Sequence, residues 1–365
     1  MPRHGAASYR REPAVGVVGR VSIDHGERRA QVREFLEVTA DESSDTYAMA
    51  SSFADHGVLA RFPPRQPAVG LYRARDREDA VTALIASHYT LSGAPVMQPP
   101  RFSFADRVAA AATAGFAGVG VDSSDYAAIR AAGTSGAELC RVLDDHGMRA
   151  LEIEFHFDWA HDGRRGRDAR DREAVFHEMA ALFAPDHLNV GELGAPGDAP
   201  PVEVLAERFG EVCDRAAQHG TRVAFEFLPW TAVPDLATAW EIVGRADRPN
   251  GGVLLDAWHY FCGNPDPVLL GSIPGERITG VQLDDADATR VGPLAEDTML
   301  RRRLPGAGSF DLRGLVRILD EIGVEAPFSV EILSLEHQAL PVDDAARRTY
   351  ESTVAVLDAA RHRTG

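Results

Sequence analysis

Short apolar runs alternate with amphipathic stretches along most of this chain. From about residue 88, runs rich in Val, Ile, Leu and Phe are followed by segments whose apolar residues recur every three or four positions, which is the period of a helix packed by one face. Several of these helical segments end in glycine, the residue expected just past a helix. The pattern predicts eight strands, at 89–94, 118–122, 149–155, 187–191, 222–227, 252–256, 278–283 and 328–332.

Eight strands alternating with helices over about 270 residues predict an α/β fold, a (β/α)8 barrel of the TIM type. An open, doubly wound sheet is the rival architecture. Such a sheet more usually has five or six strands, and no Gly-x-Gly-x-x-Gly follows a predicted strand here. The closed barrel is therefore the favoured fold.

Residues 1–87 do not follow this repeat. They read as a helix, a loop, a strand and a second helix, an order that faintly resembles the first part of an NTF2-like cone fold, including the stretch at 53–62. The sheet that would complete such a fold is missing, so we favour a partly disordered N-terminal extension that packs on the barrel. The barrel itself is predicted at 88–365.

Composition narrows the class of protein only slightly. Hydrophobic residues make up 45% of the 365 residues and charged residues 25%, both ordinary for a soluble globular protein. No apolar run reaches the roughly 18 residues that a membrane span needs, and the N-terminus does not read as a signal peptide. The three cysteines are far apart and form no Cys-x-x-Cys pair, which fits a reducing cytosol and predicts a cytoplasmic protein.

Charge excludes several functions. A net charge of −17 would repel a phosphate backbone, so nucleic acid is not an expected partner. All 38 basic residues are arginines, because the chain contains no lysine. Schiff-base aldolases, pyridoxal-phosphate enzymes and P-loop nucleotide hydrolases each need a lysine amine, and these classes are excluded.

Reactive groups in a parallel α/β barrel lie at the C-terminal ends of the strands. Four polar residues interrupt otherwise apolar strands at the ends of predicted strands five to eight, namely Glu226, Asp256, Gln282 and Glu331. They occupy corresponding heights on adjacent strands, so we expect them to converge near the barrel axis. Three carboxylates in one place repel each other strongly unless a cation lies among them. The alternative is that arginines such as Arg222 or Arg302 neutralise them.

The four predicted donors are all oxygen atoms. Hard oxygen donors favour one Mn²⁺ or Mg²⁺ ion, with Co²⁺ as a further option, over Zn²⁺. Such an ion polarises the carbonyl of a hydroxy-ketone and stabilises the enediolate left when a neighbouring carbon loses its proton. Glu226 and Glu331, on opposite sides of the barrel mouth, are the candidate bases. His259 either moves a proton or only orients Asp256 or Glu226.

Candidate substrate contacts lie near other predicted strand ends. Glu152 and Glu154 share one face of strand three because they are two residues apart, and Glu154 is the one expected to bind a substrate hydroxyl. A barrel-layer or salt-bridge role is the alternative for this pair. His156 follows at the tip of the same strand. Trp258 follows strand six and offers an apolar wall to a ring-shaped substrate, with simple packing as the alternative.

The strand ends belong to longer recognisable stretches, namely VAFEFLPW at 223–230, LLDAWHY at 254–260, VQLDDA at 281–286, RRRLPGAGSFDL at 301–312 and FSVEIL at 328–333. These stretches resemble the sugar phosphate isomerase/epimerase family of xylose isomerase-like barrels, and the likeness covers about 89–360. The resemblance implies a metal held by Glu226, Asp256 and Glu331, together with a histidine on strand seven. Gln282 stands where that histidine is usual.

Gln282 changes the reaction that the resemblance implies. With Asp-x-x-His before it and Pro-Gly-x-Gly after it, this glutamine is similar to the bacterial 3-dehydroshikimate dehydratases, which expel a hydroxyl after the enolate step. In the related loop, the arginine three residues before Pro-Gly contacts substrate, which implies that role for Arg302. Strand three instead fits the broader inosose dehydratase-like grouping. Asp284 and Asp285 are interpreted as braces for the end of strand seven or for the arginines.

The sequence therefore predicts a divalent-metal-dependent isomerase or epimerase acting on a keto sugar or cyclitol. The alternative is a metal-dependent dehydratase, a carbon–oxygen lyase of the 3-dehydroshikimate or inosose type, which uses the same enolate step. A DNA-repair enzyme of the endonuclease IV type would need histidine-rich metal sites and a basic face, and a dead barrel would bind no metal. The expected partner is a small polyhydroxy ketone, without nucleic acid or membrane, and a homo-oligomer is compatible with the sequence.

Overall fold

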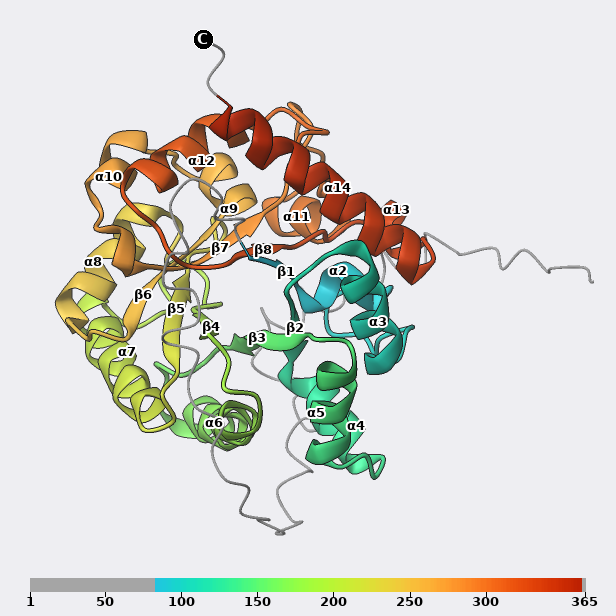
Figure 1. Ribbon diagram of the computed structural model, residues 1–365. Coiled ribbons are helices and arrows are strands. Elements are labelled where there is room, and N and C mark those ends of the chain that lie inside the picture. Colours follow the sequence, from blue (N-terminus) through green and yellow to red (C-terminus); the bar gives the residue numbers. More distant parts are fainter. Residues whose placement is uncertain (1–82, 363–365) are drawn as a thin grey trace, which may run out of the picture.

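The computed structural model describes residues 83–362, which form a closed barrel of eight parallel strands joined in chain order (Figure 1). The predicted (β/α)8 barrel is therefore confirmed. The strands are β1 Leu84–Ala86, β2 Gly118–Asp122, β3 Arg149–His156, β4 His187–Gly191, β5 Arg222–Glu226, β6 Gly251–Asp256, β7 Ile278–Leu283 and β8 Phe328–Val330.

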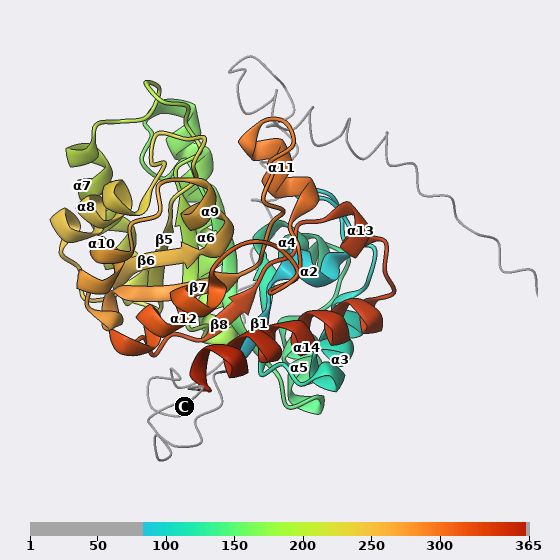
Figure 2. The same cartoon turned by 90° about the horizontal axis from the view of Figure 1, so that it is seen from above.

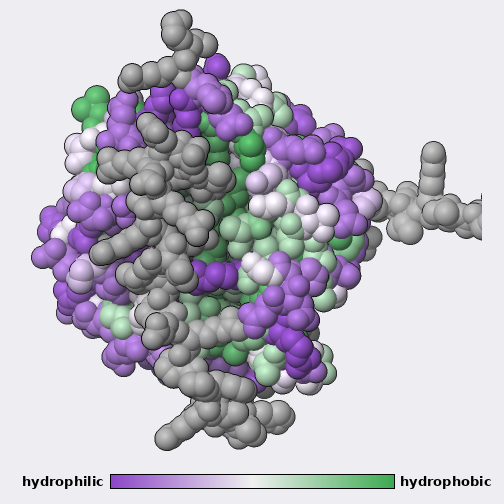
Figure 3. Space-filling model, in the orientation of Figure 1, coloured by the Kyte–Doolittle hydropathy of each residue, from purple (hydrophilic) through white to green (hydrophobic). Residues whose placement is uncertain are grey.

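Helices form an outer ring around these strands (Figures 1 and 2). Between β1 and β5 they are α2 His88–Ser92, α3 Phe104–Ala114, α4 Ser123–Ala131, α5 Gly136–Asp145, α6 Gly163–Phe183 and α7 Val202–Ala217. After β5 they are α8 Leu236–Ala246, α9 Ala257–Cys262, α10 Pro267–Ser272, the short 3₁₀ helix η2 Gly275–Arg277, α11 Leu294–Arg301, α12 Leu312–Glu321, α13 Leu335–Gln338 and α14 Val342–Arg361. Hydrophilic residues predominate on the uncovered outer helices in Figure 3. Among the described residues, no helix combines the length and apolar character of a membrane span.

The first strand is where the sequence prediction was wrong. Residues 89–94 were expected to form it, but His88–Ser92 is the helix α2, and the strand is Leu84–Ala86. Both runs are fully buried, and a short buried run does not by itself distinguish a strand from a helix turn. Parallel pairing of β1 with both β2 and β8 closes the barrel. The barrel therefore begins before the expected boundary at 88, and the predictions for 1–82 lie outside the described residues.

Side chains along β5 point alternately to the outside and to the inside of the barrel. Phe225 is fully buried on the outer face, where its ring lies 5.3 Å from that of Phe209 on α7. Successive residues of a strand point to opposite faces, so the next residue, Glu226, points into the barrel. The outward apolar side chains thus pack against the helices, and the inward polar side chains are available to the site.

Gly252 on β6 provides a test of this close packing. A Cβ at that position would lie 1.9 Å from Thr279 Oγ1 and 2.5 Å from the carbonyl oxygen of Arg277, so a neighbour must move. We expect Gly252→Ala to lower the free energy of unfolding by about 1–3 kcal/mol, as overpacked cores do. Urea denaturation measures this. Gly244→Ala on α8 is the control, because a Cβ added there would have no neighbour within 4 Å; it is expected to stabilise by about 0.5–1 kcal/mol.

Candidate active site

Three polar side chains from β5, β6 and α9 meet at the C-terminal end of the barrel. Glu226, Asp256 and His259 each place one carboxylate oxygen or ring nitrogen within 4.8 Å of the others. Asp256 also caps α9, since its Oδ1 accepts a hydrogen bond of 2.8 Å from the backbone N–H of His259. The cap begins α9 directly after β6, and His259 Nε2 lies 3.1 Å from Glu226 Oε1. The Asp-x-x-His spacing is therefore the spacing of a helix cap.

Gln282 and Glu331 continue this arrangement on the neighbouring strands. Gln282 is the register partner of Asp256 on one side and of Ser329 on the other, so it faces the same way as Asp256. Its side chain is buried, and its Oε1 accepts no hydrogen bond from the described residues. Glu331 follows directly after β8. The four predicted donors thus come from adjacent strand ends, and an unpartnered amide oxygen lies among them.

Arg302 lies inside this group and interacts with its carboxylates. Its Nη1 is 2.7 Å from Asp256 Oδ2 and 3.1 Å from Glu331 Oε2, and it also donates to Asp284. The expected bracing role of Asp284 is confirmed by this contact. We call Glu226, Asp256, Asp284 and Glu331 the acid cluster. The arginine alternative therefore holds in part, because Arg302 compensates three of the four carboxylates.

The second arginine named in that alternative does not reach the site. Arg222 forms an ion pair with Asp186 near the start of β5, at the other end of the strand from Glu226. The side chain of Arg302 is 1% exposed, and its expected substrate contact stays a prediction. Its position follows from the end of α11, where its backbone N–H donates to the carbonyl oxygen of Leu333.

Burial and mutual repulsion raise the pKa of most carboxyl groups in the acid cluster. Burial, and then the charge of Asp256, holds the pKa of Glu226 well above its usual range. Burial raises the pKa of Glu331 to about 8 against the opposing effect of Arg302. For Asp256 burial also acts upward, but Arg302 and His259 bring its pKa below the ordinary value. The repulsion that remains beside one guanidinium is relieved by protons on these groups or by a further cation that displaces them.

Glu154 reaches the acid cluster from the opposite side of the barrel. Its Oε1 accepts a hydrogen bond of 3.2 Å from the backbone N–H of His88 and lies 3.4 Å from Ser87 Oγ. The same hydroxyl is 3.3 Å from Glu331 Oε1. Burial, together with the charges of Glu152 and Glu331, raises the pKa of Glu154 well above its usual range. Glu154 is therefore placed where a ligand of the acid cluster would meet it.

Three residues on this side were not predicted from the sequence, namely Ser87, Tyr89 and Asp122. The Tyr89 hydroxyl donates to Asp122 Oδ2 at 3.3 Å, and Asp122 is the register partner of Glu154. Ser87 and Tyr89 were missed because the first strand was placed a few residues too late. Asp122 could have been predicted from the sequence, because it ends the apolar run of β2 in the same way that Asp256 ends that of β6.

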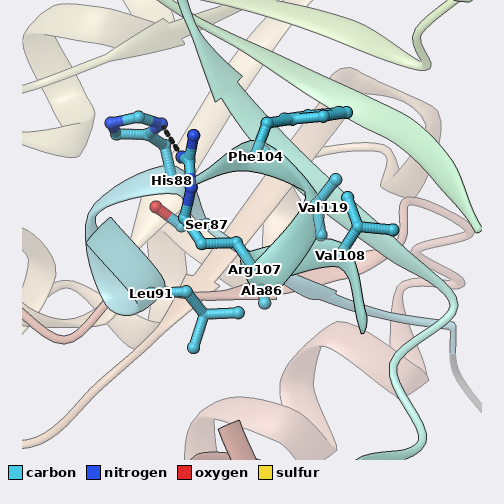
Figure 4. A pocket seen from close by; sticks show the side chains of 9 residues that line it. Ala86, Ser87, His88, Leu91, Phe104, Arg107, Val108 and Val119 are labelled. Carbon is cyan, nitrogen blue, oxygen red and sulfur yellow. Dashed lines mark hydrogen bonds between the residues drawn. The ribbon is translucent and has the colours of Figure 1, made fainter. Parts of the chain in front are cut away.

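A small cavity between β1, β2, α2 and α3 lies behind Ser87 (Figure 4). Figure 4 shows Arg107 pointing at His88, with its Nη1 2.8 Å from the ring Nδ1. Arg107 also pairs with Asp125 on α4. This arginine is therefore held outside the barrel mouth. Within residues 83–362, Arg302 is the arginine that forms ion pairs with the acid cluster.

His156 does not lie at the barrel mouth, and its expected substrate contact is contradicted. The register of β3 shifts between Ile153 and His156, so the simple alternation from Glu154 does not continue. The imidazole instead packs on the outside of the strand, 5.3 Å from the ring of Phe176 on α6 and 3.9 Å from Glu173. Burial lowers its pKa to about 3, and neither ring nitrogen has a hydrogen-bond partner among the described residues.

Glu173 makes the fold sensitive to acid. Burial alone would raise its pKa, but hydrogen bonds from His177 and Arg215 and the charge of Arg215 hold that pKa at about 2, against 4.5 for the free group. A lowered pKa stabilises the fold above the unfolded value, and this contribution is lost as pH falls from about 4.5 toward 2. We expect the unfolding free energy of Glu173→Gln to fall less steeply between about pH 5 and 2.5 than that of the wild type. Urea denaturation at each pH measures it, with the exposed Glu207→Gln as control.

Trp258 packs against aromatic residues of the site. Its side chain is fully buried, with the ring centroid 5.6 Å from His259 and 6.3 Å from Trp230. These aromatic contacts fit the packing alternative, and the expected substrate contact of Trp258 stays a prediction. Trp230 is only partly buried and lies 5.3 Å from the His259 ring. Trp230 is therefore the better candidate for an aromatic wall.

The fold and site define a class of protein, a (β/α)8 barrel with an acidic, histidine-containing centre at the C-terminal strand ends. This chain belongs to the xylose isomerase-like TIM barrel family, whose sequence model matches residues 108–355. The resemblance seen in the sequence is thereby confirmed.

Individual relatives are enzymes of two kinds. A 3-dehydroshikimate dehydratase of Pseudomonas aeruginosa is 30% identical over 239 residues, which are 65% of this chain and 37% of that protein. An inosose isomerase of Bacillus subtilis is 30% identical over 158 residues, which are 43% of this chain and 54% of that protein. The chain thus spans between about a third and about half of the length of these relatives.

A solved structure of similar fold is the IOLI protein with a bound zinc atom. It superposes with a TM-score of 0.66 at 20% identity, over 76% of this chain and 99% of that one. At this identity the likeness shows the shared barrel.

Proposed function

We propose that this protein is a divalent-metal-dependent dehydratase that acts on a cyclic polyhydroxy ketone of the 3-dehydroshikimate type. The observation that carries the proposal is the gathering of Glu226, Asp256, Gln282 and Glu331 at four adjacent strand ends, with Gln282 Oε1 left without a partner among the described residues. The dehydratase match covers 65% of the chain and the isomerase match 43%, which favours the lyase over the isomerase that the sequence suggested first.

Those four residues would hold the metal, and two observations support the fit. The amide oxygen of Gln282 is buried and accepts no hydrogen bond from residues 83–362, and the acid cluster contains more carboxylates than Arg302 compensates. Oxygen donors favour Mn²⁺ or Mg²⁺, with Co²⁺ as a further option. The IOLI protein, which has a similar fold, was solved with a bound zinc atom, and this supports the proposal of a divalent ion. When bound, such an ion lowers the energy of the negative charge that develops on a ketone oxygen.

The side chains around the ketone would divide the proton transfers. Glu226 or Glu331 takes the proton from the carbon next to the carbonyl, and the electron pair of that C–H bond moves toward the carbonyl. Cleavage of a C–O bond then releases the hydroxyl as water once it has received a proton. His259, with Nε2 3.1 Å from Glu226 Oε1, is placed to move that proton. Glu154 would accept a hydrogen bond from a ring hydroxyl.

The test follows product formation with two substrate classes. Metal-stripped protein is supplied with Mn²⁺, Mg²⁺ or Co²⁺ and then with 3-dehydroshikimate, and ultraviolet absorbance records an aromatic acid. Growth of that absorbance, and its loss on chelation, is the expected result. Absence of any product with every metal would contradict the dehydratase.

An isomerase acting on an inosose or keto sugar is the second candidate. The match to the inosose isomerase favours it, and so does Glu154, which suits a substrate rich in hydroxyl groups. The same protein is incubated with inososes and keto sugars in heavy water. Exchange of the proton next to the carbonyl, without absorbance growth, would select the isomerase.

A further inference from the structure

Arg302 contacts two of the carboxylates that would hold a metal ion. Its Nη1 lies 2.7 Å from Asp256 Oδ2 and 3.1 Å from Glu331 Oε2, and both residues belong to the proposed ligand set. The guanidinium is almost fully buried, so water does not screen its charge from an incoming cation. A divalent ion and this guanidinium therefore compete for the same two carboxylates.

We propose that Arg302 is a built-in cation that takes the place of the metal in the metal-free protein and is displaced from Asp256 and Glu331 when the metal enters. This inference rests on the proposed metal-dependent function. The two cations compete because like charges a few ångströms apart repel strongly in a buried site, even where each contacts a different oxygen of the same carboxylate. By thermodynamic linkage, the contacts of Arg302 weaken metal binding, and bound metal weakens those contacts equally.

Arg302 has a further partner that it can keep after it leaves Asp256 and Glu331. Asp284 pairs with Nη1 but is outside the proposed ligand set, so this pair survives the displacement. The backbone of Arg302 is fixed independently, because its N–H donates to the carbonyl oxygen of Leu333. Nε, which donates to Thr298 Oγ1 at 3.0 Å, belongs to the planar guanidinium and moves with it. Displacement is therefore a turn of the whole guanidinium toward Asp284, in which the contact with Thr298 is broken.

The compensation also has a structural consequence. If both the metal and Arg302 were absent, the acid cluster would hold buried carboxylates with no positive partner, which is a costly arrangement. Arg302 prevents this in the empty site, and the metal replaces it with two positive charges. Arg302 is thus a positioning residue that sets how tightly the metal binds and how stable the metal-free protein is.

Isothermal titration of MnCl₂ into metal-stripped protein tests the inference. Arg302→Met and Arg302→Gln both remove the charge, and Gln keeps a polar side chain in case Met does not fold. We expect both to bind Mn²⁺ more tightly than the wild type, by roughly tenfold or more. Arg302→Lys retains a charge and is expected to stay near the wild-type affinity. The matched control is Arg303→Met, because the neighbouring Arg303 pairs with Asp287 and Glu336, away from the acid cluster.

Thermal unfolding provides a second readout that a purely structural role would not produce. The metal-free Arg302 variants are expected to melt below the wild type, and added Mn²⁺ is expected to raise their Tm by more than it raises that of the wild type. Equal or weaker Mn²⁺ affinity in both neutral variants would overturn the inference while the metal site stands. Absence of Mn²⁺ binding in every protein would remove the metal-dependent function, and the inference with it.

Discussion

Asp256→Asn is expected to abolish turnover and Mn²⁺ binding while the barrel remains folded. Asparagine is an equally good helix cap, so the hydrogen bond from the His259 backbone to this position is retained. What is lost is the negative charge at the centre of the acid cluster and the charge partner of Arg302 Nη1. We expect kcat/KM to fall by roughly 10³-fold or more, since a metal contributes several kcal/mol to this kind of transition state. Steady-state kinetics and calorimetry measure the two effects.

A control variant distinguishes the effect of losing the negative charge from the effect of changing a helix cap. Asp266→Asn changes the same residue type in the same role, because Asp266 caps α10 through the backbone N–H groups of Val268 and Leu269. It lies in an exposed segment outside the acid cluster, so activity should stay at the wild-type level. Full activity in Asp256→Asn would rule out the proposed metal site. A fall in activity with unchanged Mn²⁺ affinity would mean that Asp256 takes part in the reaction and does not hold the metal.

His259→Gln is expected to lower kcat by roughly 10²–10⁴-fold with little change in Mn²⁺ affinity. Loss of a positioned acid or base has this effect. Burial lowers the pKa of His259 to about 4, so the ring is neutral at pH 7, and its Nε2 lies 3.1 Å from Glu226, within reach for a proton transfer. Glutamine retains polarity and size but does not exchange protons at neutral pH.

Two comparisons determine how the His259 result is interpreted. His146→Gln, at the exposed C-terminus of α5, is the control and should leave kcat unchanged. If Mn²⁺ affinity falls together with kcat, His259 is itself a ligand, as its place within 4.8 Å of Glu226 and Asp256 allows. If neither quantity changes, the proton-transfer role is excluded and the residue only packs between Trp230 and Asp256.

Particular residues show what was predictable. Strands β2, β4 and β7 coincide with their predicted ranges, because each is a run of five or six residues containing Val, Leu or Ile that alternates with helical segments in the repeat of a barrel. The positions of Glu226, Asp256 and Gln282 followed from the same runs, since a polar residue ending a buried strand of a parallel barrel lies at its reactive end.

The amino-acid sequence by itself thus determined the barrel, the strand ends that carry polar groups, and the chemistries that a chain without lysine cannot perform. Tertiary structure alone decided three further matters: that β1 is Leu84–Ala86, that His156 faces α6, and that Arg302 lies among the acids. The physical reason is the same in each case. Strand closure, register shifts and ion pairs between residues far apart in the chain depend on three-dimensional contacts, and local apolar periodicity carries no information about them.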